Sequence, residues 1–379
     1  MNWIALRMLT GNLGKYLGII AGVAFAALLI AQQSSIFCGL MLLTSNQIGD
    51  IQGADIWVMD PNVRFVDDIK PLSDTQLYRV RGVEGVQWAV RLYKGLSRAR
   101  LRDGNFQQVI LLGLDDATLV GAPPHMVLGN ISALRQPDAV IIDEAGYELL
   151  WPGEPFRLGR VIEMNDRRAI IVGICKASKT FQTFPIIYTL YSQAVTFAPP
   201  ERKVLSFVLA QPQEGLSAEA LCERIQEQTG LKALTNEQFR WATMLYYLEN
   251  TGIPINFGVT VVLGFIVGAA ISGQTFYLFT VENLAQYAML KAMGTTNLRM
   301  VGMILLQALL VGAIGYGIGI GLAATFGAFA QGNTKLAFYM PWQVLVGTGI
   351  AVVLMVVGAS LLSIRRVLVL EPAVVFRSG

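Results

Sequence analysis

The sequence predicts a membrane α-helical protein with four transmembrane helices in 1+3 order and a large extracytoplasmic α/β domain between helices 1 and 2. Only 15% of the 379 residues are charged, against roughly 25% in a soluble domain. The deficit lies in four segments without Asp, Glu, Lys or Arg, at residues 17–43, 255–281, 300–326 and 342–364. Each exceeds the roughly 20 apolar residues that cross a bilayer. About two hundred residues of mostly soluble character separate the first segment from the second.

Lys and Arg near the span ends predict the orientation. They flank the first span, occupy the loop at residues 282–299 and follow the last span, whereas the loop between spans three and four has only Lys335. Short loops rich in Lys and Arg stay in the cytoplasm. We therefore expect both termini and loop 282–299 in the cytoplasm and the long domain outside. The basic residues concerned are Arg7, Lys15, Lys291, Arg299, Arg365, Arg366 and Arg377.

Residues 1–15 predict a cytoplasmic interfacial helix, because apolar anchors such as Trp3 alternate with Arg7 and Lys15. A plain N-terminal extension of the first span is the alternative. Residues 16–45 predict the first transmembrane helix and a stalk. This span is too long for a signal peptide and lacks a small-residue cleavage site before Asn46, so we expect it to be retained.

The outer domain, residues 46–235, predicts a mixed α/β fold with a strand-rich subdomain near residues 139–197. Ser73 and Ser217 are expected to cap helices. Cys175 and Cys222 lie in this domain, where a disulfide can form, but their spacing does not show that they meet; Cys38 is expected to be a packing residue in the first span. Apolar or alternating runs predict strands at residues 54–59, 88–93, 109–114, 140–142, 169–174 and 204–209.

The remaining elements follow in chain order. If the stalk helices continue the first two spans outward, motion at the membrane would pass to the outer domain as by a lever. The predicted elements are a stalk helix and second span at 236–281, a cytoplasmic helix at 282–299, a third span at 300–326, a short outer loop at 327–341, a fourth span at 342–364 and a cytoplasmic tail at 365–379.

Small residues within the spans predict close helix packing. Gly264 and Gly268 form one GxxxG pair, and Gly315 and Gly319 form another. Contact within the chain and contact between two copies are both consistent with this pattern. The spans contain no charged residue, whereas ion channels and proton-coupled transporters usually carry intramembrane charges; the sequence argues against both classes.

The residues predict no catalytic and no metal site. The single histidine, His125, stands in a Pro-rich stretch and gives neither a catalytic triad nor a zinc site. No GxxxxGK[ST] motif is present for ATP. The acidic pairs at residues 67–68, 115–116 and 143–144 are typical of solvated faces or helix starts. A net charge of +3 gives no sign of nucleic-acid binding.

The cytoplasmic loop carries a short amphipathic segment, residues 282–294, that ends at Gly294, a natural helix C-cap. We expect Leu284, Ala288 and Met289 to face the bilayer or the span bases. Tyr287, Leu290, Lys291 and Gly294 are then expected to be available to a docked protein. An ordinary loop that touches only lipid is the alternative.

This segment, with LKAMGTT at residues 290–296, resembles the coupling helix of FtsX/MacB-type (type VII) ABC transporter permeases. The tail, with Arg365 and Arg366 followed by LEPA at residues 370–373, resembles the closing motif of that family. VIIDEAGYELL from Val140 and AIIVGI from Ala169 are similar to its outer-domain core. The segment QYAMLKAMG most resembles the corresponding segment of the DevC-like permeases of glycolipid exporters. The family usually has Glu where this chain has Gln286.

The resemblance implies a non-catalytic permease of the bacterial inner membrane that couples ATP hydrolysis by a separate ABC ATPase, which binds ATP and Mg, to export of a lipid-like or amphiphilic substrate. It also implies a homodimer in membrane lipid, an HlyD-type adaptor and a TolC-like outer-membrane channel. Signal transduction to an external cell-wall hydrolase and lipoprotein release are the alternatives. The implied ATPase-coupling residues are Gln286, Tyr287, Leu290, Lys291, Ala292, Met293 and Gly294, and the implied tail residues are Arg365, Arg366, Glu371 and Pro372.

Overall fold

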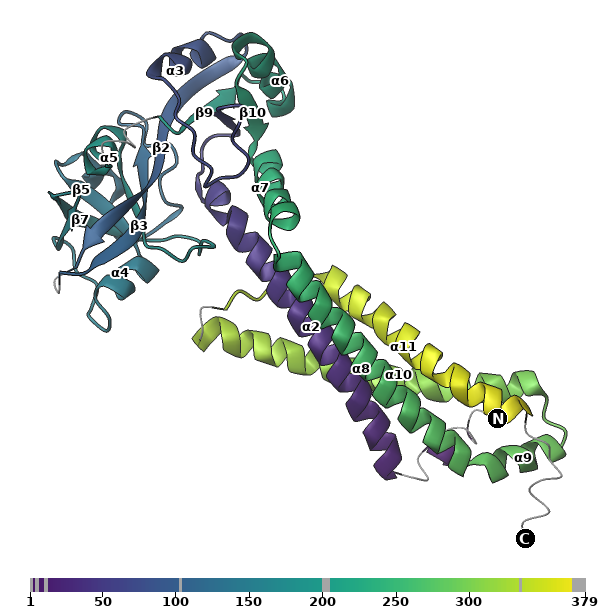
Figure 1. Cartoon of the computed structure of the whole chain (residues 1–379). Helices are drawn as coiled ribbons and strands as arrows, with labels where there is room; N and C mark the ends of the chain where they lie inside the picture. Colours follow the sequence, from purple (N-terminus) through teal and green to yellow (C-terminus); the bar gives the residue numbers. More distant parts are fainter. Residues whose placement is uncertain are drawn as a thin grey trace. The chain divides into compact units, whose positions relative to one another are not determined.

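The computed structural model describes Trp3, Arg7–Leu9 and residues 13–101, 104–199, 205–333 and 336–369. The chain divides into two compact units, one formed by Met1–Leu40 with Gly252–Gly379 and the other by Met41–Thr251 (Figure 1). The expected interfacial helix lies largely outside the described residues. Of it, Trp3 and Arg7–Leu9 are helical, and the guanidinium of Arg7 lies 5.0 Å from the centroid of the Trp3 ring.

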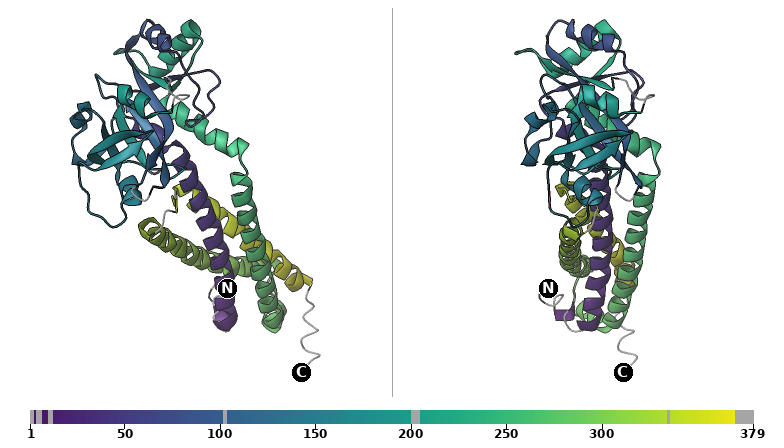
Figure 2. Two further views of the ribbon diagram at one scale, coloured as in Figure 1. Left: turned by 60° about the vertical axis from the view of Figure 1, so that its left-hand side comes forward. Right: turned by 90° about the vertical axis from the view of Figure 1, so that its left-hand side faces the viewer.

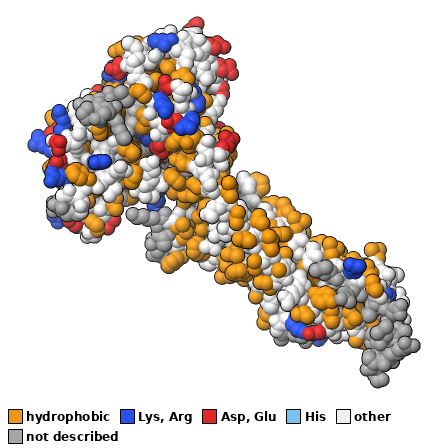
Figure 3. All heavy atoms as spheres, in the orientation of Figure 1, with side chains coloured by type: hydrophobic (Ala, Val, Ile, Leu, Met, Phe, Trp, Pro, Cys, Tyr) orange, Lys and Arg blue, Asp and Glu red, His pale blue; other side chains and the backbone are white. Residues whose placement is uncertain are grey.

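Four long helices make up the first unit. By length and composition, each is apolar enough to cross a membrane, which agrees with the predicted 1+3 order. Apolar side chains gather over these helices in Figure 3, the kind of surface that a helix exposes to lipid. The helices are α2 (Leu13–Asp50), α8 (Ile253–Glu282), α10 (Asn297–Asn333) and α11 (Trp342–Val369), and the short α9 (Leu284–Ala292) lies between α8 and α10.

Glycines allow close packing of α2 against its neighbours within this unit. A Cβ added to Gly319 of α10 would lie 2.6 Å from the carbonyl oxygen of Ala24, and one added to Gly315 would lie 2.7 Å from the Cβ of Val23. On α8, Gly264 faces Leu29 and Gly268 faces Ala26, so α2 and α8 run side by side (Figure 2). All four glycines predicted for helix packing therefore lie at contacts within the chain.

The second unit contains a ferredoxin-like lobe, a split βαβ arrangement of four antiparallel strands and two helices. Its sheet has the strand order β10-β1-β9-β2. The helix α7 (Asn236–Asn250) follows β10 directly. The elements of the lobe are β1 (Ile56–Met59), α3 (Asp74–Arg81), β2 (Val86–Arg100), β9 (Phe207–Pro212), α6 (Ala218–Thr229) and β10 (Lys232–Thr235).

An inserted lobe, residues 93–206, separates β2 from β9. The strand β2 serves both lobes, because it pairs with β9 as far as Leu92 and with β3 from Tyr93 onward. From there the order is β2-β3-β8-β5-β7-β4, with β6 joining β2 and β7. The other elements are β3 (Phe106–Leu114), β4 (His125–Gly129), η1 (Ile131–Arg135), β5 (Ala139–Asp143), α4 (Glu144–Leu150), β6 (Val161–Met164), β7 (Arg167–Lys176), β8 (Ile186–Leu190) and α5 (Tyr191–Phe197).

Several sequence expectations about this unit differ from the structure. Cys175 and Cys222 are free, buried thiols in two different apolar cores, so the disulfide does not form. His125 is exposed but begins a strand, where it pairs with Lys176. Ser217 caps α6 by accepting from the Ala220 amide, whereas the Ser73 side chain makes no capping bond to α3. The predicted subdomain near residues 139–197 shares its sheet with β3, β4 and the second half of β2.

Candidate functional site

The helix α9 is a separate element between two long helices, and both of its ends are well defined. Asn283 ends α8, and its side-chain amide donates to the carbonyl oxygen of Phe279 at 2.8 Å. Gly294 follows α9 with φ +88°, a left-handed conformation that favours glycine. The Gly294 amide donates to the Lys291 carbonyl at 3.0 Å, and the Thr295 amide donates to the Leu290 carbonyl at 3.1 Å. These bonds satisfy carbonyls that a helix end would otherwise leave unpaired.

Contacts hold α9 and its entry to three other helices. The hydroxyl of Tyr287 donates to Oε1 of Gln307 in α10 at 3.1 Å. The ammonium of Lys291 donates to the carbonyl oxygen of Leu368 in α11 at 3.0 Å. Glu282, the last residue of α8, forms an ion pair with Lys15 of α2. A displacement of α9 must therefore act on α2, α10 and α11 as well as on α8.

The exposed side of α9 differs from the one that the sequence predicted. Tyr287 is 0% exposed and Leu290 is buried, so the expectation that they are available to a docked protein is wrong. Met289, expected to face the bilayer or the span bases, is 50% exposed, and Met293 is 74% exposed. The reason is that the Tyr287 hydroxyl has a buried partner in α10, which fixes the rotation of the helix.

The exposed side of the helix defines one uncharged surface, the α9 face. It consists of Ala285, Gln286, Met289, Ala292 and Met293. Gln286, Met289 and Met293 are spaced three and four residues apart, so they lie on one side of a helix. Burial raises the pKa of the Tyr287 hydroxyl, and Lys291 is bonded to α11. The α9 face thus presents amide and thioether groups rather than charges.

The tail residues are only partly within the described structure. Arg365 is exposed at the end of α11, and the backbone of Arg366 continues that helix. Glu371 and Pro372 lie outside the described residues. Within the described residues, the tail contacts α9 through the bond that the Leu368 carbonyl accepts from Lys291.

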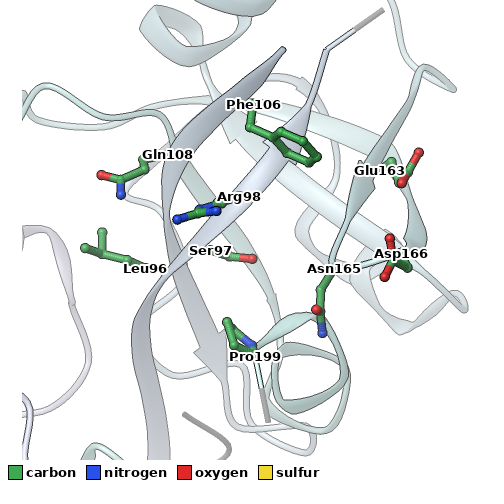
Figure 4. A pocket seen from close by; sticks show the side chains of 9 residues that line it. All are labelled: Leu96, Ser97, Arg98, Phe106, Gln108, Glu163, Asn165, Asp166 and Pro199. Atoms are coloured by element: carbon green, nitrogen blue, oxygen red, sulfur yellow. The ribbon is translucent and has the colours of Figure 1, made fainter. Parts of the chain in front are cut away.

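A cavity of about 470 Å³ lies in the inserted lobe beside the β2–β3 hairpin. Figure 4 shows Arg98 pointing toward Gln108, and Glu163 and Asp166 on the opposite side of the cavity. Among the described lining residues, Ser97 has the one hydroxyl, which donates to the carbonyl oxygen of Phe197 at 3.1 Å, and none of them has an imidazole or a thiol. Within the described residues, no group of three or more His, Cys, Asp or Glu side chains could hold a metal.

Buried charges in the second unit have structural partners. Lys94 is 3% exposed and donates to Oδ1 of Asp67 at 2.5 Å and to the carbonyl oxygen of Val66 at 2.9 Å. Burial lowers the pKa of Lys94, and the Asp67 carboxylate opposes that change. Asp143 accepts from the Ile186 amide at 2.8 Å, and burial raises its pKa to about 6. Both groups are thus bonded within strand and loop contacts of the inserted lobe and its neighbours.

Two protein families match this chain. Residues 16–228 match the MacB-like periplasmic core domain, and residues 258–372 match the FtsX-like permease C-terminal region. The chain belongs to the FtsX/MacB-type ABC transporter permeases. The inserted lobe and the ferredoxin-like lobe as far as residue 228 fall within the first match, and α9 falls within the second. The resemblance that the sequence showed at residues 290–296 and 140–174 is thereby confirmed.

The chain is also similar to individual relatives and to solved structures. An uncharacterized ABC transporter permease of Mycobacterium tuberculosis, found in strains H37Rv and CDC 1551, is 24% identical over 339 residues, which cover 86% of this chain and 85% of the relative. The periplasmic region of MacB from Actinobacillus actinomycetemcomitans is 13% identical, covers 54% of this chain and 96% of that chain, and has a TM-score of 0.37. The extracellular domain of the noncanonic ABC-type transporter YknZ from Gram-positive bacteria is 15% identical. The match covers 48% of this chain and 98% of that chain, with a TM-score of 0.33.

Family membership settles the general role of the chain. It is an ABC transporter permease, a class of generally non-catalytic subunits, and the family implies an ATPase partner. The four apolar helices and the MacB-like periplasmic domain fit an inner-membrane protein. Sequence reasoning did not name Lys15, Glu282 or Gln307 as site residues. The available signal was Gln307, an isolated polar side chain within an otherwise apolar segment.

Proposed function

We propose that this permease drives export by mechanotransmission, with α9 as the coupling helix for a separate cytoplasmic ATPase. The observation that carries the proposal is the attachment of α9 and its entry to α2, α10 and α11 through Glu282, Tyr287 and Lys291. Both termini and α9 are placed in the cytoplasm on the charge distribution. ATP and Mg are bound by the ATPase and not by this chain.

In this mechanism, closure of the ATPase dimer displaces α9, and the attached helices follow. The α2 helix is unbroken over 38 residues, about 57 Å at 1.5 Å per residue. It can therefore carry a tilt from the membrane segment to the outer domain. The energetic requirement is that the ATPase binds the two permease conformations with different affinity.

The α9 face defines the contact with the ATPase. Five of the seven residues that the resemblance implies for this contact remain accessible or half-buried: Gln286, Lys291, Ala292, Met293 and Gly294. Tyr287 and Leu290 act from the buried side by fixing the position of the helix. Since the α9 face lacks the usual Glu at residue 286, apolar packing of Met289 and Met293 replaces an acidic contact.

The proposed assembly is a homodimer in membrane lipid, with an HlyD-type adaptor and a TolC-like channel carrying a lipid-like or amphiphilic substrate outward. The two-lobed MacB-like outer domain supports adaptor docking. The absence of Asp, Glu, Lys and Arg from the interior of the four predicted spans supports an amphiphile over an ion.

Affinity purification of the full chain with mass spectrometry of its partners tests this function. We expect an ABC ATPase together with an HlyD-like adaptor. A Met293→Glu variant places a charge on the α9 face and should lose the ATPase while remaining folded. Leu158→Glu, at a 42% exposed apolar position of the inserted lobe, is the matched control and should retain it. Full ATPase recovery with Met293→Glu would contradict the docking surface, and recovery of a cell-wall hydrolase without an adaptor would replace export by signalling.

A further inference from the structure

The last turn of α2 is bonded to the connection between β7 and β8 in the inserted lobe. Asp50 ends the helix and is 7% exposed. Its Oδ2 accepts from the Ser178 amide and its Oδ1 accepts from the Ser178 hydroxyl, both at 2.7 Å. One turn earlier, the side-chain amide of Asn46 donates to the carbonyl oxygen of Lys179 at 3.2 Å. In the described residues, no ion pair involves Asp50, so Ser178 is the partner that keeps this carboxylate in place.

The same connection also contacts α7. The rings of Phe181 and Tyr247 lie 5.1 Å apart, centroid to centroid. Residues 178 and 179 thus touch α2, and residue 181 touches α7. The connection between β7 and β8 lies between the two helices, and a change in their separation must displace it.

The ferredoxin-like lobe is attached differently, through α7. Thr235 and Gln238 form a reciprocal capping box at the start of α7. The side chain of Asn236 accepts from the Trp57 indole at 2.6 Å and donates to the Ala54 carbonyl at 2.8 Å. The ring of Phe239 packs 5.3 Å from that of Trp57. The start of α7 is therefore fixed to β1 and moves with this lobe.

The chain link from α2 to the ferredoxin-like lobe is not helical. Five residues, from Ile51 to Asp55, connect the end of α2 to β1 without regular structure, and Gly53 among them has φ +89°. A short irregular link with glycine can absorb rotation better than a helix can. The end of α2 is thus hydrogen-bonded to the inserted lobe, whereas the start of α7 is fixed to the ferredoxin-like lobe.

We propose that Asp50 and Ser178 are positioning residues that make the inserted lobe follow α2, so that movement of α2 against α7 changes the angle between the two lobes. The proposal rests on the proposed mechanotransmission. It adds the contact through which the movement of α2 reaches the inserted lobe rather than the ferredoxin-like lobe. Asp50 acts through Ser178 and the β7–β8 connection, with no contact to cargo or nucleotide.

The test measures the distance between the lobes in the full permease with its ATPase in lipid nanodiscs. Spin labels at Arg157→Cys in the inserted lobe and Glu227→Cys in the ferredoxin-like lobe occupy exposed positions. Cys38→Ser removes the half-buried thiol, while Cys175 and Cys222 are buried. Distance distributions are recorded by pulsed electron paramagnetic resonance without nucleotide and with ATP and vanadate.

We expect a nucleotide-dependent shift of the distance in the labelled parent and its loss in Asp50→Ala, with ATP hydrolysis retained. Ser178→Ala removes one of the two bonds and should reduce the shift, whereas Ser178→Thr should keep it. Asp60→Ala is the matched control, because Asp60 lies outside the link and accepts from the amide and the side chain of Asn62 within the ferredoxin-like lobe. If the nucleotide-dependent distance shift were unchanged in both Asp50→Ala and Ser178→Ala, the positioning role of these two residues would be wrong, but the mechanotransmission would not be contradicted. Absence of any shift in the parent, with the ATPase bound and active, would overturn the mechanotransmission as well.

Discussion

The hydroxyl of Tyr287 donates to the side-chain oxygen of Gln307 at 3.1 Å, which joins the short α9 helix to the apolar α10 helix. Both side chains are buried. This bond fixes which side of α9 faces the long helices, and therefore which side is left for a partner. A nine-residue helix has little stability of its own, so tertiary contacts of this kind hold it in place.

Replacing Tyr287 by Phe should loosen α9 without opening a cavity. The ring remains, but the donor to Gln307 is lost, at a cost of about 1–3 kcal/mol for a buried polar group that loses a partner. We expect a lower thermal midpoint of the purified permease and weaker stimulation of the ATPase by the permease. Tyr316→Phe, which removes a bond to the carbonyl of Leu345 away from α9, is the control for stability alone. Unchanged ATPase stimulation in Tyr287→Phe would argue against a coupling role for this bond.

The prediction of α9 from sequence shows where such reasoning succeeds and where it stops. The apolar segments, the short amphipathic helix and its end at Gly294 depend on local composition, and the structure has them all. The rotation of α9 depends on a partner in another helix. Apolar residues occur on both sides of α9, so local composition does not decide whether Tyr287 or Met289 is buried. The bond to Gln307 decides that question.

The outer domain shows a similar division. Apolar runs predict six of the ten described strands but not β4, β6, β8 or β10, although β8, Ile186–Leu190, is buried throughout. Its neighbours are β3, a parallel partner that ends more than 70 residues earlier, and β5. The 15-residue β2 also gives no local sign that it leaves one sheet for another at Tyr93. Local sequence patterns do not predict pairing between strands that lie so far apart in the sequence.

Two glycines in α10, only two positions apart, should respond oppositely to alanine. A Cβ at Gly319 meets the backbone oxygen of Ala24 at 2.6 Å, whereas a Cβ at Gly317 meets nothing within 4 Å. Gly319→Ala should force α10 away from α2 and destabilise the protein by about 1–3 kcal/mol. Gly317→Ala should be neutral or stabilising by up to about 1 kcal/mol, because alanine favours a helix. Thermal unfolding of both variants in the same detergent measures the difference, and equal midpoints would contradict the packing described.

The buried pair Lys94–Asp67 should matter far more than an exposed pair in the same unit. Lys94→Met removes the charge and leaves Asp67 without its cation, and breaking a buried pair in this way costs about 3–5 kcal/mol. Arg168→Met breaks an exposed pair with Asp138 and should cost about 0–1 kcal/mol. Urea unfolding followed by intrinsic tryptophan fluorescence compares them. A similar cost for both variants would show that burial of Lys94 adds nothing to its pairing.

Asp143 should make stability fall as the pH rises from about 4 to about 6. Its pKa is 3.8 in an unfolded chain and about 6 in the folded protein, with burial as the main cause. Between these two pH values Asp143 is protonated in the folded state but not in the unfolded state, so each rise in pH favours unfolding. The stability that the protonated Asp143 contributes is fully lost above about pH 6. Asp143→Asn keeps an acceptor for the Ile186 amide but carries no charge. The midpoint of this variant relative to the parent should therefore increase from pH 4.5 to pH 7. A constant difference across that range would show that Asp143 does not titrate there.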